Sequence, residues 1–145
     1  MGKILITGAN GFVGRYLVRD LLQNNYAVVA TARHYNELPF AGEKFSFFSM
    51  DFTDEQQVKA VFEEVNPSVV IHCGAMSKPD ECELDKPAAL LNNVHGTALL
   101  LRWAAVYKSH FIYLSTDFVF DGNKAMHKES DEPVPVNFYG HTKLL

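Results

Sequence analysis

The sequence predicts an α/β fold in three layers, with a doubly wound parallel sheet covered by helices on both faces. Short apolar segments alternate with segments whose apolar residues recur at helical spacing, which is typical of right-handed strand–helix–strand units. The apolar segments are nearly continuous, as expected of parallel strands that are buried on both sides. The 145 residues are enough for a sizeable core, so we expect one domain over residues 1–145.

Local patterns define the individual elements. Val13, Leu17 and Leu21 recur at helical spacing after the first strand. Thr53 to Gln56 is a capping-box pattern that begins a second helix. Pro87 begins a third, and a long loop over residues 117–137 precedes a fourth. The predicted strands are 3–7, 26–31, 45–49, 68–73 and 109–116; the predicted helices are 12–23, 53–65, one from Pro87 with Leu90, Val94, Ala98, Leu101 and Ala105 on one face, and one from about Phe138.

Composition and charge argue against several classes of protein. The net charge is −4 with Lys and Arg scattered, so nothing indicates nucleic-acid binding. No apolar run approaches the roughly 20 residues that span a bilayer. Gly8 comes too early for a signal peptide, so we expect a cytoplasmic protein with no membrane partner and with Cys73 and Cys82 as reduced thiols. The six histidines form no pair at metal-binding spacing, and no metal is expected.

A glycine-rich turn links the first strand to the first helix. Gly8, Gly11 and Gly14 follow the spacing G-x-x-G-x-x-G. Glycines let a backbone turn sharply and approach phosphates, and the helix N-terminus supplies free N–H groups and the positive end of a dipole. The turn therefore predicts a Rossmann-type site for a dinucleotide pyrophosphate, although three glycines also occur in ordinary strand–helix loops.

The end of the second strand bears on the choice of cofactor. NAD-preferring folds carry an Asp or Glu there, which binds the ribose 2′-hydroxyl. This strand ends instead in Thr31-Ala32-Arg33-His34, and Arg33 could pair with a 2′-phosphate, helped by Arg15. Asp51, after the third strand, could bind the adenine amine. The pattern favours NADP, with NADPH preferred over NADH, unless these are plain surface residues.

Tyr139 and Lys143 lie four residues apart, and therefore one turn apart on the same helical face. A nearby ammonium should lower the tyrosine pKa from about 10 and suit Tyr139 to proton donation. Thr116, just past a parallel strand, could hold the carbonyl oxygen that receives the proton. These residues predict a reductase site.

Several segments together resemble the extended short-chain dehydrogenase/reductase superfamily, and more narrowly its dTDP-4-dehydrorhamnose reductase branch. They are TGANGFVG at 7–14, LSTDFVFDG at 114–122, NFYGHTK at 137–143 and NVHGT at 93–97. The resemblance implies reduction of the 4-keto group of a nucleotide-linked deoxysugar, on the route to dTDP-rhamnose for surface polysaccharide. A nucleotide-sugar substrate is the implied partner, and a homodimer is a possible assembly.

The resemblance also assigns residues. Thr116, Tyr139 and Lys143 would be catalytic, Lys143 would also bind the nicotinamide ribose, and Asn93 would be a structural or proton-relay residue. The expected cofactor contacts are Gly8, Asn10, Gly11, Phe12, Val13, Gly14, Arg33, Asp51, Phe52, Cys73, Gly74, Ala75, Asn93, Tyr139 and Lys143.

Two departures from the branch leave alternatives open. The segment 75–82 lacks the usual aromatic-Thr pair after the alanine, which leaves the sugar open. The chain also ends two residues after Lys143. We therefore expect a truncated chain without its C-terminal substrate-binding portion, binding cofactor weakly and turning over poorly. The alternatives are a nucleotide-sugar epimerase or dehydratase, or a non-catalytic subunit resembling the methionine adenosyltransferase regulatory subunit.

Overall fold

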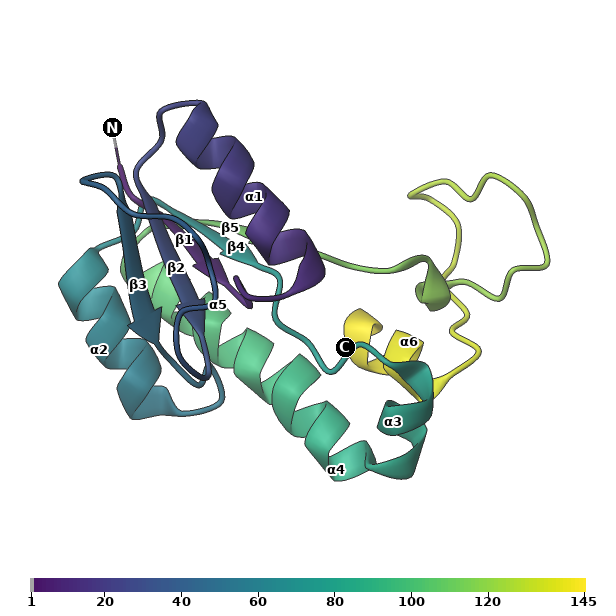
Figure 1. Ribbon diagram of the computed structural model, residues 1–145. Coiled ribbons are helices and arrows are strands. Elements are labelled where there is room, and N and C mark those ends of the chain that lie inside the picture. The colour runs from purple at the N-terminus through teal and green to yellow at the C-terminus, as the bar shows by residue number, and fades with distance from the viewer. Residues whose placement is uncertain (1) are drawn as a thin grey trace. The chain divides into compact units, whose positions relative to one another are not determined.

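The computed structural model describes residues 2–145, which divide into two compact units (Figure 1). The first, here the sheet unit, comprises residues 2–74 and Gly96–Leu114. The second, here the helical unit, comprises Ala75–His95 and Ser115–Leu145.

The sheet unit contains five strands, all parallel, in the order β3-β2-β1-β4-β5. The chain winds outward from β1 to β3 and then crosses to the other side of β1, which confirms the predicted doubly wound α/β architecture. In register, Leu5 of the central strand lies beside Val29 and Val70. The strands are β1 Ile4–Thr7, β2 Val28–Ala32, β3 Phe45–Ser49, β4 Val69–His72 and β5 His110–Tyr113.

Helices cover both faces of this sheet, as the sequence predicts. Helix α1, Phe12–Gln23, packs on one face, where Val18 joins Ile4 and Ile6. Helices α2, Glu55–Val65, and α5, Gly96–Val106, pack on the other face around Leu5 (Figure 1). Adjacent residues of β1 enter different cores because successive side chains of a strand point to opposite faces.

Helix α2 begins one residue later than its capping pattern suggests. The N-cap is Asp54, whose Oδ1 accepts hydrogen bonds from Gln56 N at 2.9 Å and Gln57 N at 3.2 Å. Thr53 is not the cap, because its hydroxyl donates to Asp51 Oδ1 at 2.8 Å. Helix 12–23 and strand 45–49 agree to the residue, whereas the predicted strand 109–116 extends three residues beyond β5, which ends at Tyr113.

The helical unit consists of short elements. Helix α3 was not predicted. A single helix was predicted from Pro87 through at least Ala105, whereas the structure divides this stretch into α4, a π-helical segment and α5. The predicted helix near Phe138 is confirmed. The elements are α3 Pro79–Leu84, α4 Lys86–Ala89, the π-helix η1 Leu90–His95, the 3-10 turn η2 Asp117–Val119 and α6 Phe138–Leu144.

The apolar face predicted for the helix after Pro87 is wrong. Leu101 is 51% exposed, whereas Leu99 and Leu100 are buried at 5% and 0% exposure. The run from Ala98 to Leu101 is apolar throughout, so helical spacing alone is consistent with burial of the face that contains Leu101 or of the face that contains Leu99 and Leu100. The π-helical segment, with its wider hydrogen-bond spacing, also breaks the 3.6-residue period between Leu90 and α5.

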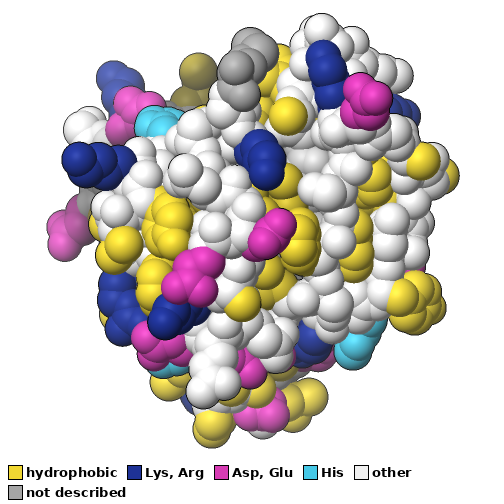
Figure 2. All heavy atoms as spheres, turned by 90° about the vertical axis from the view of Figure 1, so that its left-hand side faces the viewer, with side chains coloured by type: hydrophobic (Ala, Val, Ile, Leu, Met, Phe, Trp, Pro, Cys, Tyr) yellow, Lys and Arg dark blue, Asp and Glu magenta, His cyan; other side chains and the backbone are white. Residues whose placement is uncertain are grey.

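Charged side chains of both signs are interspersed on the face of the molecule seen in Figure 2. This distribution accords with the modest net charge of −4. Among the described residues, no helix has both the length and the apolar character that crossing a membrane requires.

Candidate active site

The glycine turn between β1 and α1 is tightly built. Gly8 has a φ of +67°, which L side chains rarely adopt, and a Cβ there would lie 2.7 Å from the backbone of Gly74. A Cβ on Gly14 would collide with the Gly8 carbonyl oxygen. Gly11 N donates to that same oxygen at 3.0 Å and Gly11 is the N-cap of α1. The turn therefore ends in a helix N-terminus with no capping side chain, a geometry suited to an anion.

Residues around the turn extend this surface. Phe12 and Val13 occupy the first two positions of α1, and Phe12 is 79% exposed. The Asn10 side chain donates to the Tyr35 carbonyl at 3.0 Å, and Arg15 Nη2 donates to the Asn10 carbonyl at 2.9 Å. Asn10 thus ties the turn to the segment that follows β2.

Arg33 and Asp51, considered separately in the sequence, form an ion pair. Arg33 Nε lies 3.0 Å from Asp51 Oδ2. Partial burial alone would raise the Asp51 pKa, but hydrogen bonds from the Thr53 N–H and hydroxyl, together with the Arg33 charge, hold that pKa below its usual value. The carboxylate is therefore ionised at neutral pH beside the guanidinium.

Phe52 packs against the ends of β4 and α5. A Cβ on Gly74 would lie 2.6 Å from Phe52 Cε1, and a Cβ on Gly96 would lie 2.6 Å from Phe52 Cδ2. Cys73 N donates to Thr7 O at 3.1 Å, which joins the strand end before Gly74 to the start of the glycine turn. The predicted contacts Phe52, Cys73 and Gly74 thus lie around the same strand ends.

His72 is a buried residue that the sequence analysis did not single out. Its Nδ1 lies 2.6 Å from Thr7 Oγ1 and its Nε2 lies 3.1 Å from Thr97 Oγ1. It therefore links β4 to the residue that precedes Gly8. A lone histidine in an apolar strand carries no distinguishing pattern, so only the structure reveals this role.

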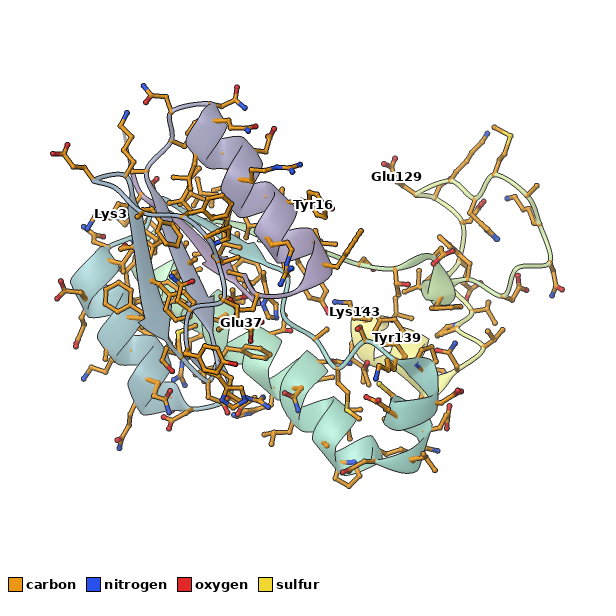
Figure 3. All side chains as sticks on the ribbon, viewed as in Figure 1. Lys3, Tyr16, Glu37, Glu129, Tyr139 and Lys143 are labelled. Carbon is orange, nitrogen blue, oxygen red and sulfur yellow. The ribbon has the colours of Figure 1, made fainter. Side chains whose placement is uncertain are left out.

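In the helical unit, Tyr139 and Lys143 both come from α6 and are each 8% exposed (Figure 3). Asn137 caps this helix, with its Oδ1 accepting from Gly140 N at 2.7 Å. Thr116 Oγ1 caps η2 by accepting from Phe118 N at 3.3 Å, and the Phe118 ring of η2 packs edge-on against the Tyr139 ring, with 6.1 Å between the ring centroids. The structure thus brings the predicted Thr116 and Tyr139 together.

The Tyr139 pKa moves opposite to the sequence-based expectation. Burial of the phenol raises its pKa above 10.0, and the Cys82 thiolate that forms at alkaline pH and the Asp117 carboxylate add to this, while the Thr116 side chain lowers the pKa in part. Desolvation of the charged form prevails over the effect expected from Lys143. Tyr139 is therefore protonated at neutral pH, which is the form a proton donor requires.

Asn93 in η1 is 1% exposed, and its side-chain amide forms hydrogen bonds with other residues of the helical unit. Its Oδ1 accepts from Met76 N at 2.8 Å, and its Nδ2 donates to Met76 O at 3.0 Å and to Thr142 Oγ1 at 2.9 Å. Thr142 Oγ1 in turn donates to Tyr139 O at 2.7 Å. These bonds fix the backbone beside Ala75 to the helix of Tyr139 and Lys143.

The candidate residues therefore form two groups. The glycine turn, Arg33, Asp51 and Phe52 belong to the sheet unit, whereas Thr116, Tyr139, Lys143, Asn93 and Ala75 belong to the helical unit. Across residues 2–145, no cluster of three His, Cys, Asp or Glu side chains is arranged to hold a metal ion.

Curated relatives match nearly the whole chain. Methionine adenosyltransferase 2 subunit beta from Danio rerio is 36% identical over 143 residues, 98% of this chain and 41% of that protein. A dTDP-4-dehydrorhamnose reductase from Aggregatibacter actinomycetemcomitans is 33% identical over 145 residues, 99% of this chain and 45% of that protein. The chain thus spans less than half the length of these relatives.

Solved structures give the same picture. A hypothetical dTDP-4-dehydrorhamnose reductase from Sulfolobus tokodaii is 35% identical with a TM-score of 0.84, over 98% of this chain and 49% of that one. The dTDP-4-dehydrorhamnose reductase of Bacillus anthracis, in complex with NADP, is 29% identical with a TM-score of 0.82, over 99% and 47%. A UDP-glucose 4-epimerase from Brucella ovis, in complex with NAD, is 26% identical with a TM-score of 0.88, over 99% and 45%.

The family model described as RmlD substrate binding domain matches residues 2–145. Together with the reductase relatives and structures, this match confirms the resemblance to the dTDP-4-dehydrorhamnose reductase branch. The chain belongs to the RmlD substrate binding domain family.

Proposed function

We propose that residues 1–145 form the NAD(P)-binding part of an NADP-preferring reductase that acts on a nucleotide-linked 4-keto-deoxysugar. The observation that carries this proposal is the buried, protonated Tyr139, one helical turn from Lys143 and packed against Phe118 of the turn that Thr116 caps. The glycine turn and the NADP-bound and NAD-bound relatives support a nicotinamide cofactor.

The chain's residues suit the binding of such a cofactor. The turn from Gly8 to Gly14 and the first N–H groups of α1 would hold the pyrophosphate. Arg33 would face the 2′-phosphate, and Asp51 the adenine amine. Gly74 and Ala75 would pass close to the cofactor, and Lys143 would bind the nicotinamide ribose.

Proton transfer follows from the Tyr139 environment. The cofactor, when bound, supplies a hydride to the C4 carbonyl carbon of the sugar. Tyr139 donates its phenolic proton to the carbonyl oxygen, so that hydride and proton together convert the ketone to an alcohol. The Thr116 hydroxyl holds the same oxygen, and the Lys143 ammonium stabilises the phenolate left on Tyr139.

Two measurements test this proposal. Calorimetric titration should show NADPH binding more tightly than NADH, with the difference reduced in Arg33→Ala. If NADPH oxidation depends on a nucleotide-linked 4-keto-deoxysugar, Tyr139→Phe should lower kcat by about 100-fold or more, since general acid catalysis typically contributes that much. Absence of binding by either cofactor, or full turnover in Tyr139→Phe, would contradict the proposal.

A second candidate is a non-catalytic regulatory subunit. It is favoured by the 36% identity to methionine adenosyltransferase 2 subunit beta, against 33% for the reductase relative. In that case the chain should co-purify with a methionine adenosyltransferase catalytic subunit and alter its activity, and Tyr139→Phe should leave that effect intact. Sugar reduction that is lost in Tyr139→Phe would instead favour the reductase.

A further inference from the structure

The Arg33–Asp51 ion pair lies at the carboxyl ends of β2 and β3, the edge at which parallel sheets of this kind bind ligands. The Arg33 side chain is 49% exposed and that of Asp51 28% exposed, so both are accessible to a bound molecule. These two strands are adjacent and in register, with Ala32 beside Ser49. The pairing therefore follows from the topology of the sheet.

The Asp51 carboxylate is held in place by contacts other than Arg33. Its Oδ1 accepts hydrogen bonds from Thr53 N at 2.9 Å and from Thr53 Oγ1 at 2.8 Å. The Asp51 N–H donates to Gln57 Oε1 at 2.9 Å. With one oxygen bound by Thr53, the other oxygen, Oδ2, faces the Arg33 guanidinium.

This arrangement affects the two forms of the cofactor differently. A phosphate monoester carries close to two negative charges at neutral pH, whereas a ribose 2′-hydroxyl is uncharged. A carboxylate 3.0 Å from the guanidinium offsets much of its field and repels an approaching phosphate. The same carboxylate exerts little net force on a hydroxyl. The Asp51 charge should therefore weaken binding of NADPH but not of NADH.

We propose that Asp51 determines cofactor selectivity: by pairing with Arg33, its carboxylate limits the preference for a 2′-phosphate over a 2′-hydroxyl. This inference rests on the proposed binding of NADPH through Arg33. It gives Asp51 a role distinct from contact with adenine. An adenine contact would be common to NADPH and NADH and would cancel in the ratio of their dissociation constants.

The test measures that ratio, Kd for NADH over Kd for NADPH, by calorimetry on one preparation of each variant. Asp51→Asn keeps an oxygen acceptor for Thr53 but removes the charge, and we expect the ratio to rise about tenfold. Asp20→Asn, the same substitution at an exposed site on α1, should leave the ratio unchanged. In an Arg33→Ala background, Asp51→Asn should change the ratio by less than about twofold. A partly unfolded preparation weakens both apparent affinities equally and does not move the ratio.

Four results would overturn the inference. An unchanged ratio in Asp51→Asn would mean that the carboxylate does not influence selectivity, and a lower ratio would mean that it orients Arg33 for the phosphate. An undiminished effect in the Arg33→Ala background would show that Asp51 acts without Arg33. Failure of the unmodified chain to bind either cofactor would refute the proposed function as well. If the chain binds the cofactors but the ratio of dissociation constants is the same in Asp51→Asn, this inference alone is refuted.

Discussion

The side-chain amide of Asn93 donates a hydrogen bond of 2.9 Å to the hydroxyl of Thr142, 49 residues further along the chain. The Thr142 hydroxyl in turn donates a hydrogen bond of 2.7 Å to the backbone carbonyl of Tyr139. Asn93 also bonds both backbone groups of Met76. The buried Asn93 amide thus connects the backbone at Met76 to the helix that carries Tyr139, the proposed proton donor.

Asn93→Ala should destabilise the protein by about 2–4 kcal/mol, because it leaves buried polar groups of Met76 and Thr142 without this partner. Urea unfolding followed by circular dichroism measures the loss. The neighbouring Asn92, whose amide bonds the Ala88 carbonyl at 2.8 Å, is the matched control, and its alanine variant should lose less than about 1 kcal/mol. Equal losses in the two variants would contradict the assigned role of Asn93.

Gly14→Ala should lower NADPH affinity at least about tenfold, since a Cβ there collides with the Gly8 carbonyl oxygen and must displace the turn. Calorimetric titration measures the change. Gly11→Ala is the comparison, because its Cβ meets the same oxygen at 3.1 Å and a small adjustment relieves the contact. If Gly11→Ala lowers NADPH affinity more than Gly14→Ala does, the close approach of Gly14 to the Gly8 carbonyl oxygen is not what determines the shape of the turn.

Stability should fall at alkaline pH in a manner that depends on Tyr139. Burial raises its folded-state pKa above the unfolded value of about 10. The corresponding stability is present below pH 10 or so and is lost as the pH rises through the folded-state pKa. Urea unfolding at several pH values between about 8 and 11 should therefore show a shallower decline for Tyr139→Phe than for the unmodified chain. Tyr35, which is 75% exposed, provides the control, and Tyr35→Phe should leave the decline as it is.

Gly74→Ala should destabilise the sheet unit by about 1–3 kcal/mol, because the added Cβ lies 2.6 Å from the Phe52 ring. Phe52→Leu in the same background should recover part of this loss by making room. A double-mutant cycle on the free energy of unfolding measures the coupling between the two positions. Simple additivity would show that the ring is not the obstacle.

Elements with strong local patterns were predictable from the sequence. The helix from Phe12 to Gln23 and the strand from Phe45 to Ser49 agree to the residue, because spacing and flanking residues define them locally. Helix α3, Pro79–Leu84, was missed because it is short and largely polar, so it has no clear apolar period. The exposed face of α5 was misassigned because a run of apolar residues fits two faces equally well.

The sequence by itself determined the order of the five strands and of helices α1, α2 and α6, the glycine turn and the placement of Tyr139 and Lys143 on one helical face, since each depends on residues close together in the chain. Only the tertiary structure decided that Arg33 pairs with Asp51, that Asn93 holds Thr142, and that the Tyr139 pKa rises. Hydrogen bonds, ion pairs and desolvation depend on which distant residues meet and on how much water they exclude. Local pattern carries no information about either.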